Sequence, residues 1–213
     1  MFITGIGTDV GKTVASAVVV QALQAHYWKP IQAGFEQGTD SETVKKLVTN
    51  SNSVFYPEVY KLVAATSPHW AAAQENIDID IHKLVEQLPK PQQPLVIEGA
   101  GGLLVPVNSE EFVVDIIKAL NARVILVSRN YLGSINHSLL TAQVCKQHGL
   151  DVIGWLFNDE RYIDYEADIC RWTQLPSLGT IPYSEELNQA FIHQTADQLR
   201  PQLLKMCLGN DEE

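Results

Sequence analysis

A glycine-rich segment near the start of the chain holds the residues most suited to chemistry. Residues 5–13, Gly-Ile-Gly-Thr-Asp-Val-Gly-Lys-Thr, follow a short apolar run at residues 1–3. Glycines let the backbone fold so tightly that several N–H groups point at one anion, and a helix beginning near Lys12 adds its positive dipole end. Lys12 would then reach the β- and γ-phosphates of a nucleotide, and the Thr13 hydroxyl would bind Mg²⁺.

The spacing of this loop departs from the general phosphate-loop pattern. Five residues separate Gly5 from Gly11, whereas the general pattern has four. The alternative is a glycine-rich turn between a strand and a helix, with an incidental lysine. The apolar run before the loop and the helix-forming residues 14–23 after it favour nucleotide binding, because the motif requires a strand before it and a helix after it.

Two charged residues are expected at the carboxyl ends of strands, the edge of a parallel sheet where ligands bind. Lys29 ends a strand expected to begin at Tyr27, because Pro30 limits that strand. Its neighbours are equally consistent with a site residue and with a solvated lysine. Glu98 follows the apolar strand 94–97 and begins a glycine-rich turn, where it would either hold Mg²⁺ or face solvent.

A third charged residue, Asp40, has two interpretations. It lies in Thr39-Asp40-Ser41-Glu42, ahead of a helix expected over residues 43–48. Small polar and acidic residues of this kind cap helix N-termini and interact favourably with the helix dipole. Judged from its neighbours alone, capping is the favoured role of Asp40.

The periodicity of apolar residues predicts alternating helices and strands. Helices are expected over residues 14–23, 43–48, 67–75, 80–88, 112–120, 138–144 and 195–208, and strands over residues 1–3, 27–29, 94–97, 123–128, 151–157 and 178–182. Residues 51–66 have no clear period. The alternation predicts one α/β domain over residues 1–213, P-loop NTPase-like, with a mostly parallel sheet and helices on both faces. A turn at Gly133 would also present a helix N-terminus suited to an anion.

Composition narrows the class of protein further. The formal net charge of −10 disfavours nucleic acid and anionic membranes as partners. The three cysteines are odd in number and lack metal-ligand spacing, so we expect buried, reduced thiols in a cytoplasmic protein. The sequence has no run of about 18 apolar residues, so we expect no membrane span. We also expect no leader peptide, because the first strand begins at Met1. The acidic residues 211–213 are expected to form a tail.

Taken together, the motifs resemble the dethiobiotin synthase family. The phosphate loop matches that family's variant, including its extra residue. The matching segments are residues 7–13, Lys29-Pro30 with Gly34, residues 66–69, 98–102, 135–137 and 141–143, Gly154-Trp155 with Asn158-Asp159, and Ile181-Pro182. They follow one another in the family's order over almost the whole chain up to the final helix.

The resemblance implies an ATP- and Mg²⁺-dependent ring closure in biotin synthesis. CO₂ adds to one amine of 7,8-diaminononanoate, ATP phosphorylates the carbamate, and the second amine closes the ureido ring. Such phosphoryl transfer depends mainly on positioning and charge neutralisation. Lys12 and Lys29 would be the catalytic residues, with Lys29 between the carbamate and the γ-phosphate.

The resemblance also assigns binding residues. It implies the metal ligands Thr13, Asp40 and Glu98, which reverses the local preference for Asp40 as a cap. It implies that ATP is bound by Asp9, Val10, Gly11, Lys12, Thr13, Val14, Asn158, Asp159, Pro182, Tyr183 and Ser184, with Asn158 and the last three framing the adenine. It implies that substrate is bound by Thr8, Lys29, Gly101, Gly133, Ser134, Ile135 and Asn136. The family is dimeric, and residues 133–136 would bind the substrate carboxylate in the site of the other subunit.

Two positions depart from the family pattern. Ala33 stands where the family usually has Ser or Thr, so one hydroxyl contact to substrate is missing, and Tyr131 stands where some members have a basic residue. His137 is given no role.

The sequence also argues against two other classes of protein. A ParA/MinD-like ATPase switch would carry an additional lysine near the start of the loop, where Gly5 and Ile6 stand. An amidotransferase-linked synthetase of corrin metabolism would need a glutaminase domain, for which 213 residues leave no space.

Overall fold

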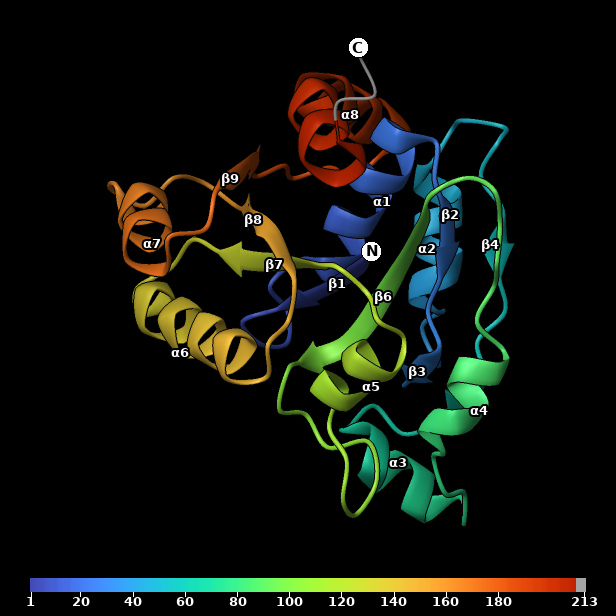
Figure 1. Ribbon diagram of the computed structural model, residues 1–213. Coiled ribbons are helices and arrows are strands. Elements are labelled where there is room, and N and C mark those ends of the chain that lie inside the picture. Colours follow the sequence, from blue (N-terminus) through green and yellow to red (C-terminus); the bar gives the residue numbers. More distant parts are fainter. Residues whose placement is uncertain (210–213) are drawn as a thin grey trace.

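The computed structural model describes residues 1–209, so the acidic residues 211–213 lie outside the described part. A seven-stranded sheet forms the centre of the molecule, in the order β4-β2-β6-β1-β7-β8-β9 (Figure 1). These strands are β1 (Phe2–Gly5), β2 (His26–Trp28), β4 (Phe55–Tyr56), β6 (Leu95–Gly102), β7 (Val124–Arg129), β8 (Val152–Asn158) and β9 (Ser177–Ile181). Every pairing within the sheet is parallel.

Helices α1 to α7 lie between successive strands along the chain, and α8 follows the last strand. They are α1 (Lys12–Leu23), α2 (Asp40–Leu47), α3 (Pro68–Gln74), α4 (Ile81–Glu86), α5 (Val113–Ala119), α6 (Ser134–Gln147), α7 (Tyr165–Thr173) and α8 (Gln189–Leu203), and a π-helical turn, Leu204–Leu208, follows α8. Two short strands, β3 (Ile31–Ala33) and β5 (Tyr60–Leu62), pair with each other apart from the main sheet. No helix among residues 1–209 is long and apolar enough to cross a membrane.

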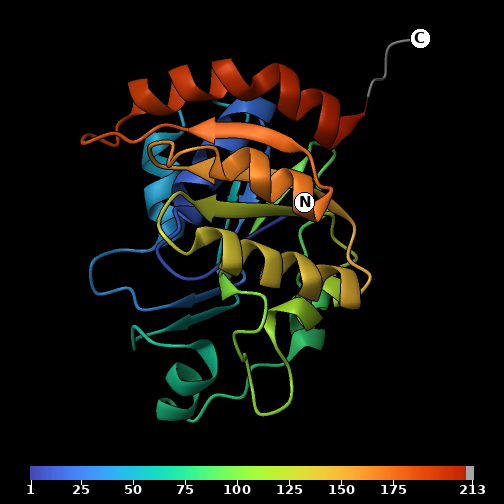
Figure 2. The same cartoon turned by 90° about the vertical axis from the view of Figure 1, so that its left-hand side faces the viewer.

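The sheet has a hydrophobic core on each face because its strand residues alternate in direction. Ile3 of β1 packs into a cluster with α1, α2 and α8, whereas its neighbour Phe2 packs into a second cluster with α3, α4, α5, α6 and α7. In β6, Val96 joins the first cluster and Ile97 the second. Figures 1 and 2 show α1 and α8 on one side of the strands and α5 and α6 on the other. The predicted α/β class with helices on both faces is confirmed.

The expected end of a strand before Pro30 is confirmed, because β2 ends at Trp28 and the chain continues as β3 only at Ile31. Pro30 has no N–H to donate, and its carbonyl oxygen accepts hydrogen bonds from Val59 and Tyr60. The turn expected after Glu98 is wrong, because β6 continues through Gly102, which pairs with Gly5 of β1. Glu98 therefore lies inside a strand and not at its end.

Helix boundaries were predicted less well. Helix α6 begins at Ser134 and α8 at Gln189, both earlier than expected, and α7 was not predicted. Residues 51–66 contain two short strands with loops between them, as expected for a stretch without a clear period. These differences leave the order of the main elements unchanged.

Candidate active site

The loop between β1 and α1 has the backbone of an anion-binding loop. Gly11 is the N-cap of α1 with φ of 91°, a conformation that favours glycine, and a Cβ there would collide with the Asn158 side chain. Asp9 also has positive φ, at 57°. Lys12 begins the helix and is buried, and its Nζ donates to the Gly7 carbonyl oxygen at 2.8 Å. The loop therefore presents a lysine and a helix N-terminus at one place, as predicted.

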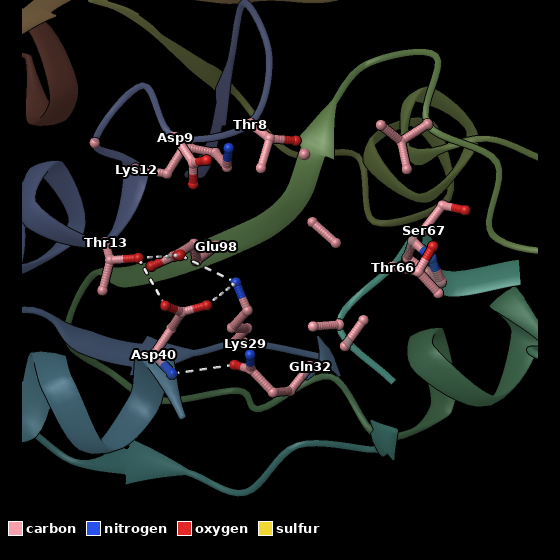
Figure 3. Close-up of a pocket in the computed structure, with 17 residues that line it drawn as sticks. Thr8, Asp9, Lys12, Thr13, Lys29, Gln32, Asp40, Thr66, Ser67 and Glu98 are labelled. Atoms are coloured by element: carbon pink, nitrogen blue, oxygen red, sulfur yellow. Dashed lines mark hydrogen bonds and ion pairs between the residues drawn. The ribbon is translucent and has the colours of Figure 1, made fainter. Parts of the chain in front are cut away.

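A cavity of about 790 Å³ opens beside this loop (Figure 3). Its walls come from the loop, the end of β2, β3, the start of α2, residues 65–68 and β6. Of the residues predicted to act, it is lined by Thr8, Asp9, Gly11, Lys12, Thr13, Lys29, Asp40, Glu98 and Gly101. Figure 3 shows the loop residues on one side of the space and Thr66 and Ser67 on another. Segments distant in sequence thus converge on one cavity at the carboxyl edge of the sheet.

The wall beneath the loop is a network of charged and polar groups. The Lys29 ammonium lies 2.8 Å from Asp40 Oδ2 and 3.0 Å from Glu98 Oε1. Thr13 Oγ1 lies 3.0 Å from both Asp40 Oδ1 and Glu98 Oε1, so its single proton is shared between two acceptors. Glu98 is only 1% exposed and Lys29 only 4%. These four residues come from α1, the end of β2, α2 and β6, and Figure 3 shows them facing one another.

Burial and charge pairing set the protonation of this network. Burial alone would lower the pKa of Lys29, but Glu98 and Asp40 outweigh it, and the pKa is raised. Burial would likewise raise the pKa of Asp40, but the Lys29 ammonium and the Thr13 hydroxyl hold it below its usual value. At neutral pH the Lys29 ammonium and the Asp40 carboxylate are therefore both ionised. Lys12 lacks so close a carboxylate, and burial lowers its pKa to about 8.

The oxygen set suits a hard divalent cation. Thr13 Oγ1 contacts the carboxylates of Asp40 and Glu98, and the Lys29 ammonium pairs with the same two carboxylates, so one hydroxyl and two carboxylates lie together beside a cationic group. Within residues 1–209 no group of three or more His, Cys, Asp or Glu forms a metal cluster. Mg²⁺ does not need such a cluster, because it takes one or two carboxylates together with substrate phosphates and water. The predicted ligands therefore fit Mg²⁺ bound with a nucleotide.

Comparison with known proteins identifies the family. A family model described as an AAA domain matches residues 1–190. The ATP-dependent dethiobiotin synthetase BioD of Christiangramia forsetii is 44% identical over 205 residues, covering 96% of this chain and 98% of that protein. This chain belongs to the ATP-dependent dethiobiotin synthetase family. The synthetase of Cytophaga hutchinsonii is 45% identical and covers 90% of this chain and 92% of its own length. The family resemblance of the sequence motifs is confirmed.

Solved structures support the fold of this synthetase family member. A chain of the MinC:MinD cell division protein complex of Aquifex aeolicus superposes with a TM-score of 0.64 at 13% identity, covering 100% of this chain and 96% of that chain. The ParA family ATPase of Chlorobium tepidum gives 0.58 at 14% identity, covering 96% and 94%. Likeness at such low identity shows the fold alone, and the curated relatives give no support to a ParA/MinD-like switch. The P-loop NTPase-like fold is confirmed.

The structure corrects the local interpretation of Asp40. The N-cap of α2 is Thr39, whose side chain accepts from the Glu42 N–H, while the Glu42 carboxylate accepts from the Thr39 N–H. Asp40 is the first helical residue, and its carboxylate turns toward Lys29 and Thr13. The synthetase family's metal assignment for Asp40 is compatible with this placement, whereas the capping role is not.

Two polar residues of the site were missed from the sequence. Tyr27 donates its hydroxyl proton to Glu98 Oε2 at 2.9 Å, and burial and the neighbouring carboxylate raise its pKa well above 10. Gln32 accepts from the Asp40 N–H at 3.1 Å and donates to the Gly34 carbonyl oxygen at 2.8 Å, which ties the start of α2 to β3. Tyr27 looks like a core residue in an apolar strand, and only its place beside Glu98 reveals the contact.

Other predicted residues lie outside the cavity lining. Val10 is buried and Val14 is partly buried, and both pack into the core under α1. Asn158 Nδ2 donates to the Val10 carbonyl oxygen at 3.1 Å, which brings the end of β8 against the loop. Asp159 pairs with Arg129 at 2.7 Å. The other predicted residues beyond the cavity are Pro182, Tyr183 and Ser184 after β9, and Gly133, Ser134, Ile135 and Asn136 at the start of α6.

Proposed function

We propose that this chain carries out the reaction of its family, forming dethiobiotin from 7,8-diaminononanoate, CO₂ and ATP with Mg²⁺. One observation carries the proposal: a buried lysine, two carboxylates and a hydroxyl meet at the floor of a cavity whose other wall is a phosphate-binding loop. That arrangement brings a nucleotide's terminal phosphate and a second substrate to the same space. The whole chain is proposed to act as one ATP-binding unit.

The nucleotide is proposed to bind along the loop. The N–H groups at the start of α1 and the Lys12 ammonium would hold the β- and γ-phosphates, because both are positive and both border the cavity. Lys12 must then leave the Gly7 carbonyl oxygen, which is its only hydrogen-bond acceptor in the described structure. The adenine is proposed to lie toward Asn158 and residues 182–184. Tyr183, at 56% exposed, offers an aromatic face there.

Mg²⁺ is proposed to be held by Thr13, Asp40 and Glu98. When bound, it would neutralise charge on the phosphate oxygens during phosphoryl transfer. The chain's own contribution is the fixed direction of these oxygens, which the network with Lys29 already maintains.

The reaction is proposed to proceed in three balanced steps. One amine of the diamine attacks CO₂ and loses a proton, which gives a carbamate. A carbamate oxygen attacks the γ-phosphorus, and ADP leaves. The second amine then attacks the carbonyl carbon, so that phosphate and a proton are released and the ureido ring closes. Lys29, freed from Asp40 and Glu98, would place its ammonium beside the carbamate and γ-phosphate, where negative charge accumulates.

The active unit is proposed to be a dimer. The substrate carries a carboxylate, and an acidic chain needs a local positive site for it. At the start of α6 the Ser134 N–H donates to the Tyr131 carbonyl oxygen, whereas the N–H groups of Ile135 and Asn136 have no recorded acceptor in the described structure, and these residues do not line the cavity of their own chain. Exposed leucines lie near this face: Leu104 is 54% exposed, Leu132 77% and Leu140 58%. Apolar side chains such as these are suited to burial against a second copy.

The central experiment measures ATP consumption by the purified protein. We expect ADP formation only when both the diamine and bicarbonate are present, with dethiobiotin detected by mass spectrometry in equal amount. The Lys12→Ala protein serves as the control for contaminating ATPases. Consumption of ATP with neither cosubstrate present, and no dethiobiotin formed, would contradict the proposed function.

Mixing two damaged chains tests the shared site. Lys12→Ala removes a phosphate contact, and Asn136→Asp places a negative charge where the substrate carboxylate is proposed to bind. If sites are shared, a mixed dimer has one site with both lesions and one with neither, so activity returns to as much as half of wild type per heterodimer. If each chain holds a complete site, a verified heterodimer remains inactive.

A further inference from the structure

Tyr27 and Glu98 lie side by side in the interior of the sheet. Their strands β2 and β6 are paired in parallel, with Tyr27 opposite Val96. Residues two apart on a strand point to the same face, so Glu98 is the next residue of β6 on the face of Val96. Tyr27 is fully buried and Glu98 is 1% exposed. The contact between them is thus shielded from water.

The two oxygens of the Glu98 carboxylate have different surroundings. Oε1 lies 3.0 Å from both Lys29 Nζ and Thr13 Oγ1 and belongs to the network beside the cavity. Oε2 accepts the Tyr27 hydroxyl at 2.9 Å. Tyr27 does not line the cavity, so it can act on a ligand only through Glu98. A buried carboxylate oxygen without a partner would be costly, which makes this hydrogen bond a strong restraint.

We propose that Tyr27 is a positioning residue that holds Glu98 Oε2 away from the cavity, so that Glu98 offers a cation one oxygen and the site prefers Mg²⁺ to Ca²⁺. The inference rests on the proposed metal role of Glu98. Mg²⁺ demands near-octahedral geometry with short bonds to single oxygens, whereas Ca²⁺ accepts more ligands and bidentate carboxylates. A Glu98 fixed at one end therefore suits the smaller ion.

A tyrosine hydroxyl is well matched to this task. It donates one hydrogen bond without bringing a positive charge, so it does not compete with Lys29 for the charge of Glu98. The ring packs within the core beside α1, with the Phe55 ring 6.0 Å away, centroid to centroid. The donor is therefore held by packing and does not depend on a bound ligand.

Tyr27→Phe tests the inference, because it removes the hydroxyl and keeps the ring. Mn²⁺ binding to the protein with saturating ADP is followed by electron paramagnetic resonance, and Mg²⁺ and Ca²⁺ are titrated in as competitors. We expect Mg²⁺ affinity to fall roughly tenfold, as for other residues that orient metal ligands. Ca²⁺ affinity should change by less than about twofold, since a freed carboxylate can bind it with both oxygens.

Two further proteins separate positioning from general damage. Tyr60→Phe removes another buried tyrosine hydroxyl, which accepts from the Asp80 N–H, and should leave the Mg²⁺ to Ca²⁺ affinity ratio unchanged. Tyr27→Phe added to Glu98→Gln should have no further effect on that ratio, because its effect passes through the carboxylate. Thermal melting of each protein with ADP verifies that it is folded.

The outcomes distinguish this inference from the proposed function. If Glu98→Gln weakens Mg²⁺ binding but folded Tyr27→Phe keeps the wild-type ratio, the role of Tyr27 is wrong while the metal site stands. An equal loss of Mg²⁺ and Ca²⁺ affinity in Tyr27→Phe also overturns it. If the ratio shifts as expected but ATP consumption does not depend on the diamine, the inference holds and the proposed reaction fails.

Discussion

The two halves of the sheet's carboxyl edge differ in how completely they are assembled. On the β2–β6–β1 half, Lys29, Asp40 and Glu98 form buried ion pairs beside a cavity of about 790 Å³. On the β7–β8–β9 half, the ion pairs are Arg129 with Asp159 and Arg161 with Glu166, in which the arginine side chains are 48% and 78% exposed. The first half therefore has buried, paired charges already in place beside a cavity, whereas the ion pairs of the second half lie at the surface.

This difference shows which side chains already have partners within the chain and which remain available to contact a ligand. Charges that are buried must be paired within the chain, because an unpaired buried charge is strongly destabilising. Exposed residues such as Tyr183 and Asn136 need no partner within the chain, so they are available to contact a nucleotide or a second subunit. The contrast predicts large losses of folding stability when charged residues of the first half are substituted, and small losses when those of the second half are.

The largest expected effect comes from the loop itself. Lys12→Ala removes a fixed positive charge at the phosphates, and Thr13→Val removes a hydroxyl from the metal site while keeping the side chain's shape. Loss of one such electrostatic contact costs about 10²–10³ in kcat. Steady-state assays at saturating ATP and Mg²⁺ measure this, and near-normal turnover in both proteins would remove the phosphate-loop assignment.

Lys29→Met should affect both turnover and stability. With the ammonium gone, Asp40 and Glu98 face each other without a countercharge, and we expect the free energy of unfolding to fall by about 3–5 kcal/mol. Mg²⁺ with ADP should restore part of this loss, because a cation re-enters the site. Urea melts with and without Mg²⁺–ADP give the stability. Kinetic assays should show kcat collapsing while nucleotide affinity is largely kept, and an equal loss of both would refute the role of Lys29 at the carbamate.

Asp40→Asn and Glu98→Gln should alter metal dependence without unfolding the chain. Both swaps keep side-chain shape and remove a hard anionic ligand, so the half-saturating Mg²⁺ concentration should rise about tenfold or more. Initial rates across a Mg²⁺ titration report the shift. Wild-type half-saturation in Asp40→Asn would mean that Asp40 serves only as the partner of Lys29.

Of these substitutions, Asp159→Asn is expected to cause the smallest loss of folding stability. It is the matched comparison for Asp40→Asn, because each replaces an aspartate that pairs with a basic residue, one on each half of the edge. An exposed pair such as Arg129–Asp159 contributes at most about 1 kcal/mol. Asn also tolerates the positive φ of 85° at this position. Burial would raise the pKa of Asp159, but the hydrogen bond from Arg129 outweighs it and lowers the pKa.

The sign of the Asp159 contribution follows from that lowered pKa. Its stabilisation is present above the unfolded carboxyl pKa and is lost as pH falls through the lower folded value. Chemical denaturation should therefore separate Asp159→Asn slightly from wild type at pH 7, and the difference should vanish once the pH falls below the folded pKa of Asp159. A loss as large as that of Lys29→Met would break the comparison between the two halves.

Much of the site was predictable because its residues follow apolar strands or belong to one continuous loop. Lys12 and Thr13 follow from the loop pattern, whereas the neighbours of Lys29 left its role open and only the family resemblance placed it in the site. Asp40 was not resolved by its neighbours, because a capping sequence and a site carboxylate look alike until Thr39 is seen to make the cap. Tyr27 was missed because nothing in an apolar strand shows which side chain will face a carboxylate on the next strand.

The fold class was predictable, but some boundaries depended on tertiary contacts. Glycines normally weaken strands, yet β6 continues through Gly102 because that residue pairs with Gly5 in the central strand. Pro30 divides a run of strand-forming residues between two different sheets. In both places, the neighbouring strand decided the structure and not the local sequence.

The strand order also affects how the protein folds while the ribosome synthesises it. β1 is complete at Gly5, but its two neighbours in the sheet are β6 and β7, so it has no lateral partner until Gly102 has been made and lacks the second until Arg129 has been made. At about 5–20 residues per second, β1 and the loop after it are made roughly 5–20 seconds before β6 and roughly 6–25 seconds before β7. During that time the apolar β1 and α1 are exposed to chaperones and to other nascent chains. The loop therefore has a strand on both sides of β1 to support it only after β7 has been synthesised.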